Sequence, residues 1–303
     1  MLVLEIVFWG RRVKADEHEH GREDAVDAHD VAPDSHGGLD FRREGLHDLY
    51  IYLSRFPGRG PLPAGIPRAK HAKEVGMAEQ KKLEEAVEFS ENPEPRCPCV
   101  LLLDTSGSMQ GAAIEALNEG LRTFKETLTR DVLASRRVEV AIVTFDNRVV
   151  LAQDFVTADQ LEPPTLTAQG LTHMGQAINH ALDLVEARKH TYRANGVSYY
   201  RPWVFMITDG EPQGEPPEAI ESAGQRIKAL DNDQRKGVAF FAVGVEGANL
   251  DMLRRIVTRA PVKLLGLNFQ EMFIWLSASM QAVSQSQVKD QVALPPPGWG
   301  AVT

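Results

Sequence analysis

The residues best suited to do chemistry are a carboxylate and two hydroxyls at alternating positions, Asp104, Ser106 and Ser108. Gly107 stands between the two serines and lets the backbone turn tightly there. Three oxygen donors with this spacing can converge on one hard cation. Mg²⁺ is the natural candidate, because it takes about six oxygen ligands at roughly 2.0 to 2.1 Å. The segment therefore predicts a divalent-metal site.

A buried strand is expected to position this loop. Residues 100–103, with the sequence VLLL, lead directly into Asp104, and a long amphipathic segment follows Met109. An apolar run without alternation is typical of a strand that is buried on both faces in a parallel sheet. The loop is then expected at the carboxyl end of a central strand, where open α/β sheets place their ligands.

Two further loops offer oxygen donors. Thr172 lies in the Gly- and Thr-containing stretch GLTHMGQA, and Asp209 follows the apolar run WVFMIT. Simpler explanations exist for each residue alone, since Asp104, Ser108 or Thr172 can cap a helix and Asp209 can stand in an ordinary turn. Each of these explanations covers one loop and leaves the other loops unexplained.

The DTSGSM segment resembles the DxSxS motif of von Willebrand factor A domains, which forms the first part of their metal-ion-dependent adhesion site (MIDAS). The resemblance covers residues 97–288. It implies that Ser106, Ser108 and Thr172 bind the metal directly, whereas Asp104 and Asp209 act mainly through water or hydrogen bonds. It also implies Mg²⁺ or Mn²⁺ as the ion, and a protein partner that offers a Glu or Asp side chain to the open metal position.

The rest of the chain alternates apolar runs with amphipathic stretches. The segments VEVAIVTF and VAFFAVGV predict buried strands, residues 149–155 predict an antiparallel edge strand, and VKLLGL predicts the last strand. Strands that alternate with helices predict an α/β fold with a doubly wound, mostly parallel sheet flanked by helices, the Rossmann-like arrangement of A domains. An amphipathic helix after the first loop is predicted by a stripe at helical spacing: Ile114, Leu117, Leu121, Phe124 and Leu128.

The two ends of the chain lack this alternation. A purine-rich ribosome-binding sequence can be encoded just before Met77, which predicts that translation starts there. Residues 86–89 are a candidate edge strand, and Trp299 is a candidate anchor for the proline-rich end of the chain. The expected organisation is a disordered or mis-assigned extension, a lead-in segment, the A domain and a loose C-terminal tail, at residues 1–76, 77–96, 97–288 and 289–303.

Composition limits the class of protein. The formal net charge of −9 and the lack of a basic stripe argue against a nucleic-acid partner. No apolar run reaches the roughly 18 to 20 residues of a membrane span, and MLVLEIVFW lacks the flanks of a signal peptide. Cys97 and Cys99 have no zinc-site spacing and are expected as buried thiols in a reducing cytosol. These features predict a cytoplasmic protein without a membrane span.

Within the A-domain family, three stretches are similar to the bacterial TerY-type proteins of tellurite-resistance and stress-response gene clusters. The resemblance implies a cytoplasmic, non-enzymatic interaction module that works beside other proteins of its cluster, some of which carry kinase or phosphatase domains. The stretches that carry it are NPEPRCPCVLLLDTSGSM, YYRPWVFMITDGEP and FIWLSASMQAVSQS.

Two rival functions remain open. The first is a Mg²⁺-dependent phosphotransferase or phosphatase with Asp104 as the nucleophile. Such enzymes usually carry a second Asp two residues later, where this chain has Ser106, and no lysine is placed to bind a phosphoryl group. The second is an A-domain scaffold without metal. All five expected ligand positions hold the required residue types, which argues against that reading.

Overall fold

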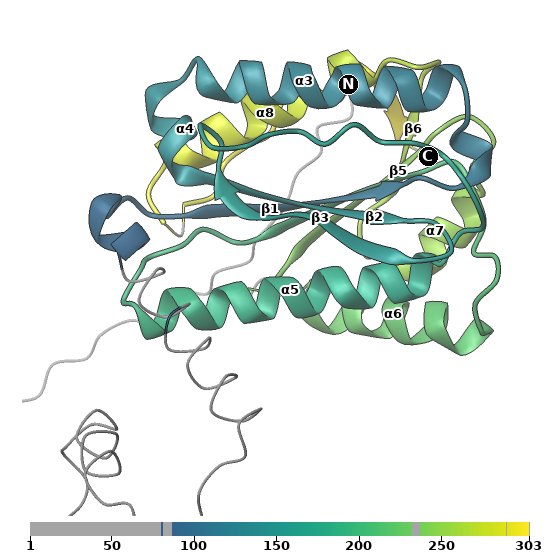
Figure 1. Cartoon of the computed structure of the whole chain (residues 1–303), viewed down its shortest axis with the longest axis horizontal. Helices are drawn as coiled ribbons and strands as arrows, with labels where there is room; N and C mark the ends of the chain where they lie inside the picture. The colour runs from purple at the N-terminus through teal and green to yellow at the C-terminus, as the bar shows by residue number, and fades with distance from the viewer. Residues whose placement is uncertain (1–79, 81–86, 232–236, 289, 303) are drawn as a thin grey trace, which may run out of the picture. The chain divides into compact units, whose positions relative to one another are not determined.

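The computed structural model describes residues 80, 87–231, 237–288 and 290–302. A seven-stranded sheet with the order β3-β2-β1-β4-β5-β6-β7 lies between two layers of helices (Figure 1). The inner strands run parallel, and the two edge strands, β3 and β7, run antiparallel to their neighbours. The predicted fold class, a doubly wound and mostly parallel α/β sheet flanked by helices, is therefore confirmed. The strands are β1 (Cys97–Asp104), β2 (Val138–Phe145), β3 (Val149–Thr157), β4 (Trp203–Thr208), β5 (Ala239–Gly244), β6 (Val262–Leu264) and β7 (Gly300–Val302).

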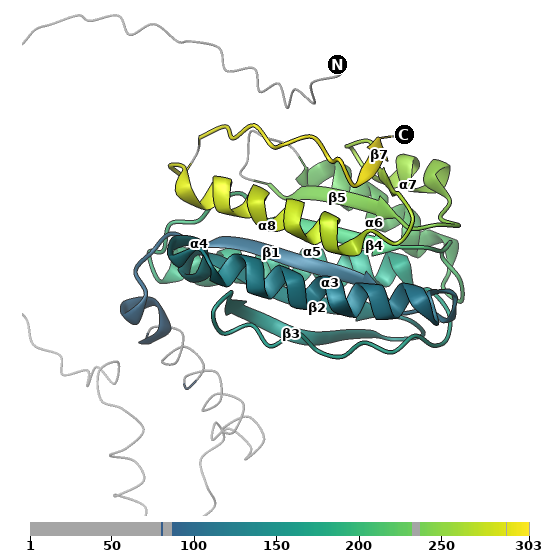
Figure 2. The ribbon, with the colours of Figure 1, turned by 90° about the horizontal axis from the view of Figure 1, so that it is seen from above.

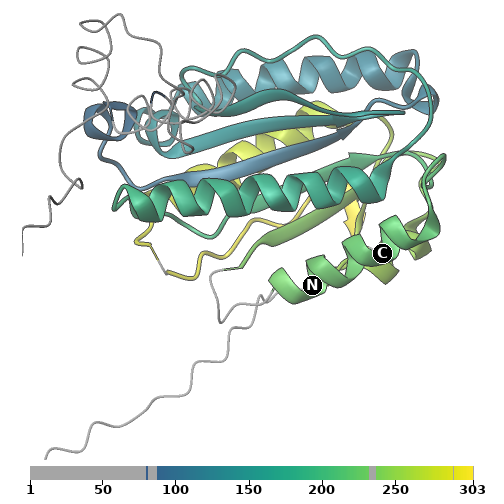
Figure 3. The same ribbon diagram turned by 60° about the horizontal axis from the view of Figure 1, so that its bottom comes forward.

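Each face of the sheet has its own helices. Helices α3, α4 and α8 cover one face, with α3 and α8 side by side (Figure 2). Helices α5, α6 and α7 cover the other face, where α5 packs along α6 (Figure 3). The helices are α3 (Ala112–Thr129), α4 (Val132–Arg137), α5 (Met174–Ala194), α6 (Pro217–Leu230), α7 (Leu250–Ile256) and α8 (Phe269–Gln285), with a 3-10 turn η1 (Gly107–Met109) before α3.

The alternation of β1 side chains explains its unbroken apolar sequence. Leu101 and Leu103 pack in the cluster with α3 and α8, whereas Val100 and Leu102 pack in the cluster with α5. All four side chains are completely buried. A strand covered on both faces needs apolar residues at every position, because each face has a helix layer to bury.

The prediction of an edge strand at residues 86–89 is wrong for the residues that are described, because residues 87–91 are helical. The charged sequence around them favours a helix, and tertiary contacts hold it. Phe89 is buried beside Tyr192, with ring centroids 6.0 Å apart, and Glu88 forms an ion pair of 3.1 Å with Arg188. Residues 1–76, and residues 77–79 and 81–86 of the lead-in, lie outside the described residues.

The C-terminal segment differs from the loose tail that its sequence predicts. Strand β7 pairs with β6, and Trp299 is only 4% exposed. Its ring meets the Trp275 ring edge to face, with centroids 5.6 Å apart, and its carbonyl accepts from the Leu265 N–H at 3.1 Å. Burial of a large aromatic ring compensates for the lack of an amphipathic pattern, so Trp299 is the anchor and the segment forms part of the fold.

Candidate metal centre

The candidate residues meet at the carboxyl ends of two neighbouring parallel strands. Asp104 is the last residue of β1, and Asp209 directly follows the last residue of β4, Thr208. From β1 the chain continues through α3 and α4 to β2 on one side, whereas β4 on the other side is reached through α5. The two strands therefore border the point where the strand order reverses, the usual ligand position in open α/β sheets.

Asp104 is fully buried, and both of its carboxylate oxygens are engaged. One oxygen accepts the Ser106 backbone N–H at 2.8 Å, and the other accepts the Thr208 hydroxyl at 2.6 Å. Burial raises the pKa of Asp104 to about 6, although these hydrogen bonds pull it the other way and the nearby Asp209 adds to the rise. The carboxylate is thus held rigidly in a setting that disfavours its own charge.

Three side chains form a chain of hydrogen bonds across the two loops. The hydroxyl oxygens of Ser106 and Ser108 are 3.1 Å apart, and the Ser108 hydroxyl donates to Asp209 at 2.8 Å. Burial also raises the pKa of Asp209, and the bond from Ser108 partly offsets that rise. Ser106 is buried, whereas Ser108 is exposed and Asp209 is half-buried, so the group is reached from solvent on one side.

The third loop brings Thr172 to the same place. Two backbone hydrogen bonds join this loop to the first one, from Gly107 N–H to Gly170 at 3.0 Å and from Gln169 N–H to Thr105 at 2.8 Å. A methyl group placed on Gly210 would lie 3.5 Å from Thr172 Oγ1 and 3.8 Å from Ser108 Oγ. These two hydroxyls therefore border one small space beside Asp209, and the structure brings all five predicted residues together.

Two supporting residues were not predicted from the sequence. Thr208 orients Asp104 through its hydroxyl, and its position directly before Asp209 is the only sequence signal for it. Glu215 accepts the backbone N–H groups of Gly175 and Gln176 at 2.7 and 3.1 Å, which fixes the start of α5 next to Thr172. Gly175 must lack a side chain, because a Cβ there would lie 2.5 Å from the Ala219 backbone of α6.

The electrostatics of the site fit a hard cation. Among the described residues, no lysine, arginine or histidine forms an ion pair with Asp104 or Asp209. The described residues hold no cluster of three His, Cys, Asp or Glu side chains, so they hold no group of three His and Cys side chains of the kind that softer metals prefer. Two carboxylates beside three hydroxyls give an all-oxygen set with negative charge and no cationic side chain to balance it, which is what Mg²⁺ or Mn²⁺ accepts.

The two cysteines lie away from these loops. Cys97 and Cys99 are free, completely buried thiols on the face of β1 that packs under α3 and α8. Burial raises the pKa of both thiols, so they remain protonated and unreactive. This confirms the prediction of two small buried side chains on one face.

A family comparison agrees with this geometry. The model of the von Willebrand factor type A domain matches residues 99–271, which is more than half of the chain. The chain therefore belongs to the von Willebrand factor type A domain family. Domains of this family are generally non-enzymatic and commonly mediate metal-dependent protein interactions through a MIDAS. The TerY-type branch within the family stays a prediction.

Several solved structures are similar to this chain at low sequence identity. Proximal thread matrix protein 1 from the mussel byssus is 18% identical over 62% of this chain and 48% of its own, with a TM-score of 0.43. An ArnB paralog from Sulfolobus acidocaldarius is 12% identical over 61% and 45%, also with a TM-score of 0.43. The pilus adhesin SpaC from Lactobacillus rhamnosus GG is 13% identical over 63% and 30%, with a TM-score of 0.49.

This chain thus spans about half of the length of the first two structures. A search of curated proteins finds no match. Within the described part of the chain, no helix combines the length and the apolar character needed to cross a membrane.

Proposed function

We propose that this protein is a divalent-metal-dependent interaction module whose metal is held by Ser106, Ser108 and Thr172. Asp104 and Asp209 act through water or hydrogen bonds, in keeping with the bonds that already occupy both oxygens of Asp104. The observation that carries this proposal is the pair of unbalanced carboxylates, both with a raised pKa, beside three converging hydroxyls. A bound Mg²⁺ or Mn²⁺ supplies the missing positive charge.

The chemistry of the ligands explains how a partner would bind. Neutral hydroxyls do little to offset a divalent charge, and Asp104 lies behind them in the core. The open position on the solvent side, near Ser108, can therefore accept a Glu or Asp side chain from another protein. Partial exclusion of water strengthens that bond. Chelation of the metal is expected to release the partner.

The structure argues against the rival in which Asp104 is a phosphotransfer nucleophile. Its side chain is completely buried, and both oxygens accept hydrogen bonds from Ser106 and Thr208. A nucleophile needs a free oxygen that faces the substrate. We therefore favour the non-enzymatic reading over a phosphotransferase or phosphatase, and over a scaffold without metal.

The finer setting of this function rests on the sequence resemblance to TerY-type proteins. It favours a cytoplasmic protein that acts in a bacterial tellurite-resistance or stress-response system. Its partners would then include proteins with kinase or phosphatase domains from the same gene cluster. In each of these settings, the partner protein would bind by offering an acidic side chain to the metal.

Removing one hydroxyl from the site tests this proposal. We expect Thr172→Val to weaken Mg²⁺ and Mn²⁺ binding to the full-length chain by at least about tenfold, because one direct ligand is lost without a change in side-chain size. Thr167→Val is the matched control, since Thr167 is exposed in the same loop and lies outside the site. Calorimetric titration, with and without an acidic peptide, measures both. Equal metal affinity in the parent and Thr172→Val would refute the assignment.

A further inference from the structure

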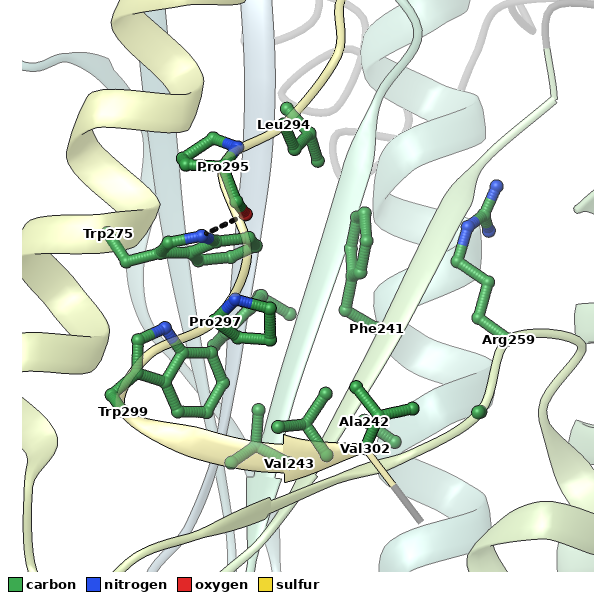
Figure 4. Close-up of a pocket in the computed structure, with 13 residues that line it drawn as sticks. Phe241, Ala242, Val243, Arg259, Trp275, Leu294, Pro295, Pro297, Trp299 and Val302 are labelled. Atoms are coloured by element: carbon green, nitrogen blue, oxygen red, sulfur yellow. Dashed lines mark hydrogen bonds between the residues drawn. The ribbon is translucent and has the colours of Figure 1, made fainter. Parts of the chain in front are cut away.

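A small cavity lies beneath the C-terminal segment, on the face of the sheet that α8 also covers. It has a volume of about 120 Å³ and shares no residue with the candidate metal centre. Figure 4 shows Trp275, Pro297 and Trp299 on one side of it and Phe241 of β5 on another. The remaining walls come from β4, β6 and β7. Segments that are far apart in the sequence therefore enclose one space.

The C-terminal wall of this cavity is held in place by specific bonds. The Trp275 indole N–H donates to the Pro295 carbonyl at 2.7 Å (Figure 4). The Trp299 carbonyl accepts the Leu265 N–H at 3.1 Å, and β7 pairs with β6 just beyond it. Pro295 and Val302 also line the cavity and are exposed, so a small molecule can reach it from solvent.

The charge of the one ionised residue in the lining faces away from the cavity. Of the residues that line it, only Arg259 is charged. The guanidinium carbon of Arg259 lies 5.3 Å from the centre of the Phe241 ring, and the guanidinium forms an ion pair with Asp231. Figure 4 places this guanidinium on the opposite side of the Phe241 ring from Trp275 and Trp299. The space between the two indoles and Phe241 is therefore uncharged.

The two indole N–H groups are not available to a ligand either. The N–H of Trp275 is bonded to Pro295. The indole nitrogen of Trp299 is buried and has no conventional acceptor among the described residues. In Figure 4 this nitrogen lies on the edge of its ring that is turned towards Trp275, and the two rings meet edge to face with centroids 5.6 Å apart. An N–H that points at an aromatic face forms a weak hydrogen bond with it. The lining side chains thus offer a ligand no free donor or acceptor.

The size and the aromatic walls of the cavity define what can enter. Apolar cavities of roughly 150 Å³ stay dry and take up benzene. A cavity of about 120 Å³ therefore suits one aromatic ring with a small substituent. Trp275, Trp299 and Phe241 supply ring faces and edges, which pack well against another aromatic ring in offset or edge-to-face geometry.

We propose that this cavity binds a small uncharged molecule built on a single aromatic ring, with the ring between Trp299 and Phe241. Removal of apolar surface from water and contacts with the surrounding rings drive the binding. A hydroxyl or charged group on the ring is disfavoured, because it would lose its water partners and gain no protein partner. This binding does not require the metal, so it stands or falls independently of the proposed function.

Toluene and phenol form a matched pair of probes for the full-length chain, since they differ only in a methyl and a hydroxyl group. We expect toluene to bind with a dissociation constant below about 1 mM and phenol to bind about tenfold more weakly, because its hydroxyl finds no partner in the cavity. Calorimetric titration without added metal measures both. Equal affinity for the two probes, or no binding of toluene, would overturn the proposal.

N-acetylphenylalaninamide tests the other occupant that such a cavity could take, an aromatic side chain of a partner protein. It carries the same ring on a peptide backbone, whose amide groups the apolar lining does not accept. We therefore expect it to bind about tenfold more weakly than toluene in the same titration. Binding as tight as that of toluene would assign the cavity to a protein partner and refute the assignment to a small molecule.

A variant and a crystal soak locate the binding. Val243 lines the cavity from β5, so Val243→Phe fills the space with a ring and should abolish toluene binding. Ala187→Phe, at an exposed position of α5 on the opposite face, is the control and should bind as the parent does. Crystals of the parent soaked with iodobenzene should show an anomalous iodine peak between Trp299 and Phe241, a result that does not depend on how any variant folds. Undiminished toluene binding in folded Val243→Phe, or a fully occupied iodine peak elsewhere and none in the cavity, would refute the assignment.

Discussion

Replacement of Asp104 by asparagine is expected to stabilise the metal-free protein and to remove its response to Mg²⁺. Burial raises the pKa of Asp104 from 3.8 to about 6, so the folded state disfavours the ionised carboxylate. That cost is fully present above about pH 6 and disappears as the pH falls towards the unfolded-state value. Asparagine has the same shape and carries no charge.

The size of the effect follows from the shift in pKa. Each unit corresponds to about 1.4 kcal/mol, so the free energy of unfolding of metal-free Asp104→Asn should exceed that of the parent by on the order of 3 kcal/mol at neutral pH. Near pH 4 the parent carboxyl is protonated in the fold, and the two proteins should converge, to within about 0.5 kcal/mol. Added Mg²⁺ should stabilise the parent and leave Asp104→Asn nearly unchanged.

Urea unfolding at about pH 7.5 and about pH 4, with and without Mg²⁺, measures these differences. Asp159→Asn is the control, because Asp159 is exposed and has no ion-pair partner among the described residues. If metal-free Asp104→Asn is less stable than the parent at neutral pH, the prediction is wrong. The ionised Asp104 carboxylate would then stabilise the metal-free fold, and a bound cation would not be needed to offset its charge.

The second large effect is expected at the opposite end of the sheet. Glu139 near the start of β2 is completely buried, and its carboxylate lies 2.7 Å from Arg96 and 2.9 Å from Arg188. It also accepts the Tyr192 hydroxyl. Arg96 is completely buried as well, so Glu139→Ala would leave its charge without a carboxylate partner among the described residues. We expect a loss of about 3 to 5 kcal/mol in the free energy of unfolding.

Denaturant unfolding checks this second prediction. Glu126→Ala is the matched control, because Glu126 is exposed and, within the described part of the chain, its one ion pair is a 3.9 Å surface contact with Arg130, which contributes about 0 to 1 kcal/mol. The folded fraction of Glu139→Ala should still bind Mg²⁺ as the parent does, since the metal centre lies at the other ends of the parallel strands. A loss below about 1 kcal/mol would show that the buried charges are not coupled in this way.

The central strands could be predicted because burial on both faces leaves a strong sequence pattern. In β1, Leu101 and Leu103 face one helix layer while Val100 and Leu102 face the other, so apolar residues occupy every position. The loops that follow such strands converge by the geometry of a parallel sheet. The three-part motif could thus be placed at one edge before the contacts among Ser108, Asp209 and the other site residues were known.

The parts that could not be predicted depend on contacts between distant residues. Thr208 bonds to a carboxylate 104 positions away, and nothing in its own neighbourhood marks that role. Strand β7 has only three residues, and it forms because β6 and the burial of Trp299 provide its partners. The helix at residues 87–91 is likewise held by Tyr192 and Arg188, far along the chain.

The most direct test of the metal centre is to locate the ion itself. Crystals of the full-length chain grown with Mn²⁺ and measured at the manganese absorption edge should show an anomalous peak bordered by the hydroxyls of Ser106, Ser108 and Thr172. In the same map, Asp104 and Asp209 should lie behind that ligand shell. A fully occupied peak at another place, or no peak in crystals grown with Mn²⁺ and an acidic peptide, would contradict the proposed site.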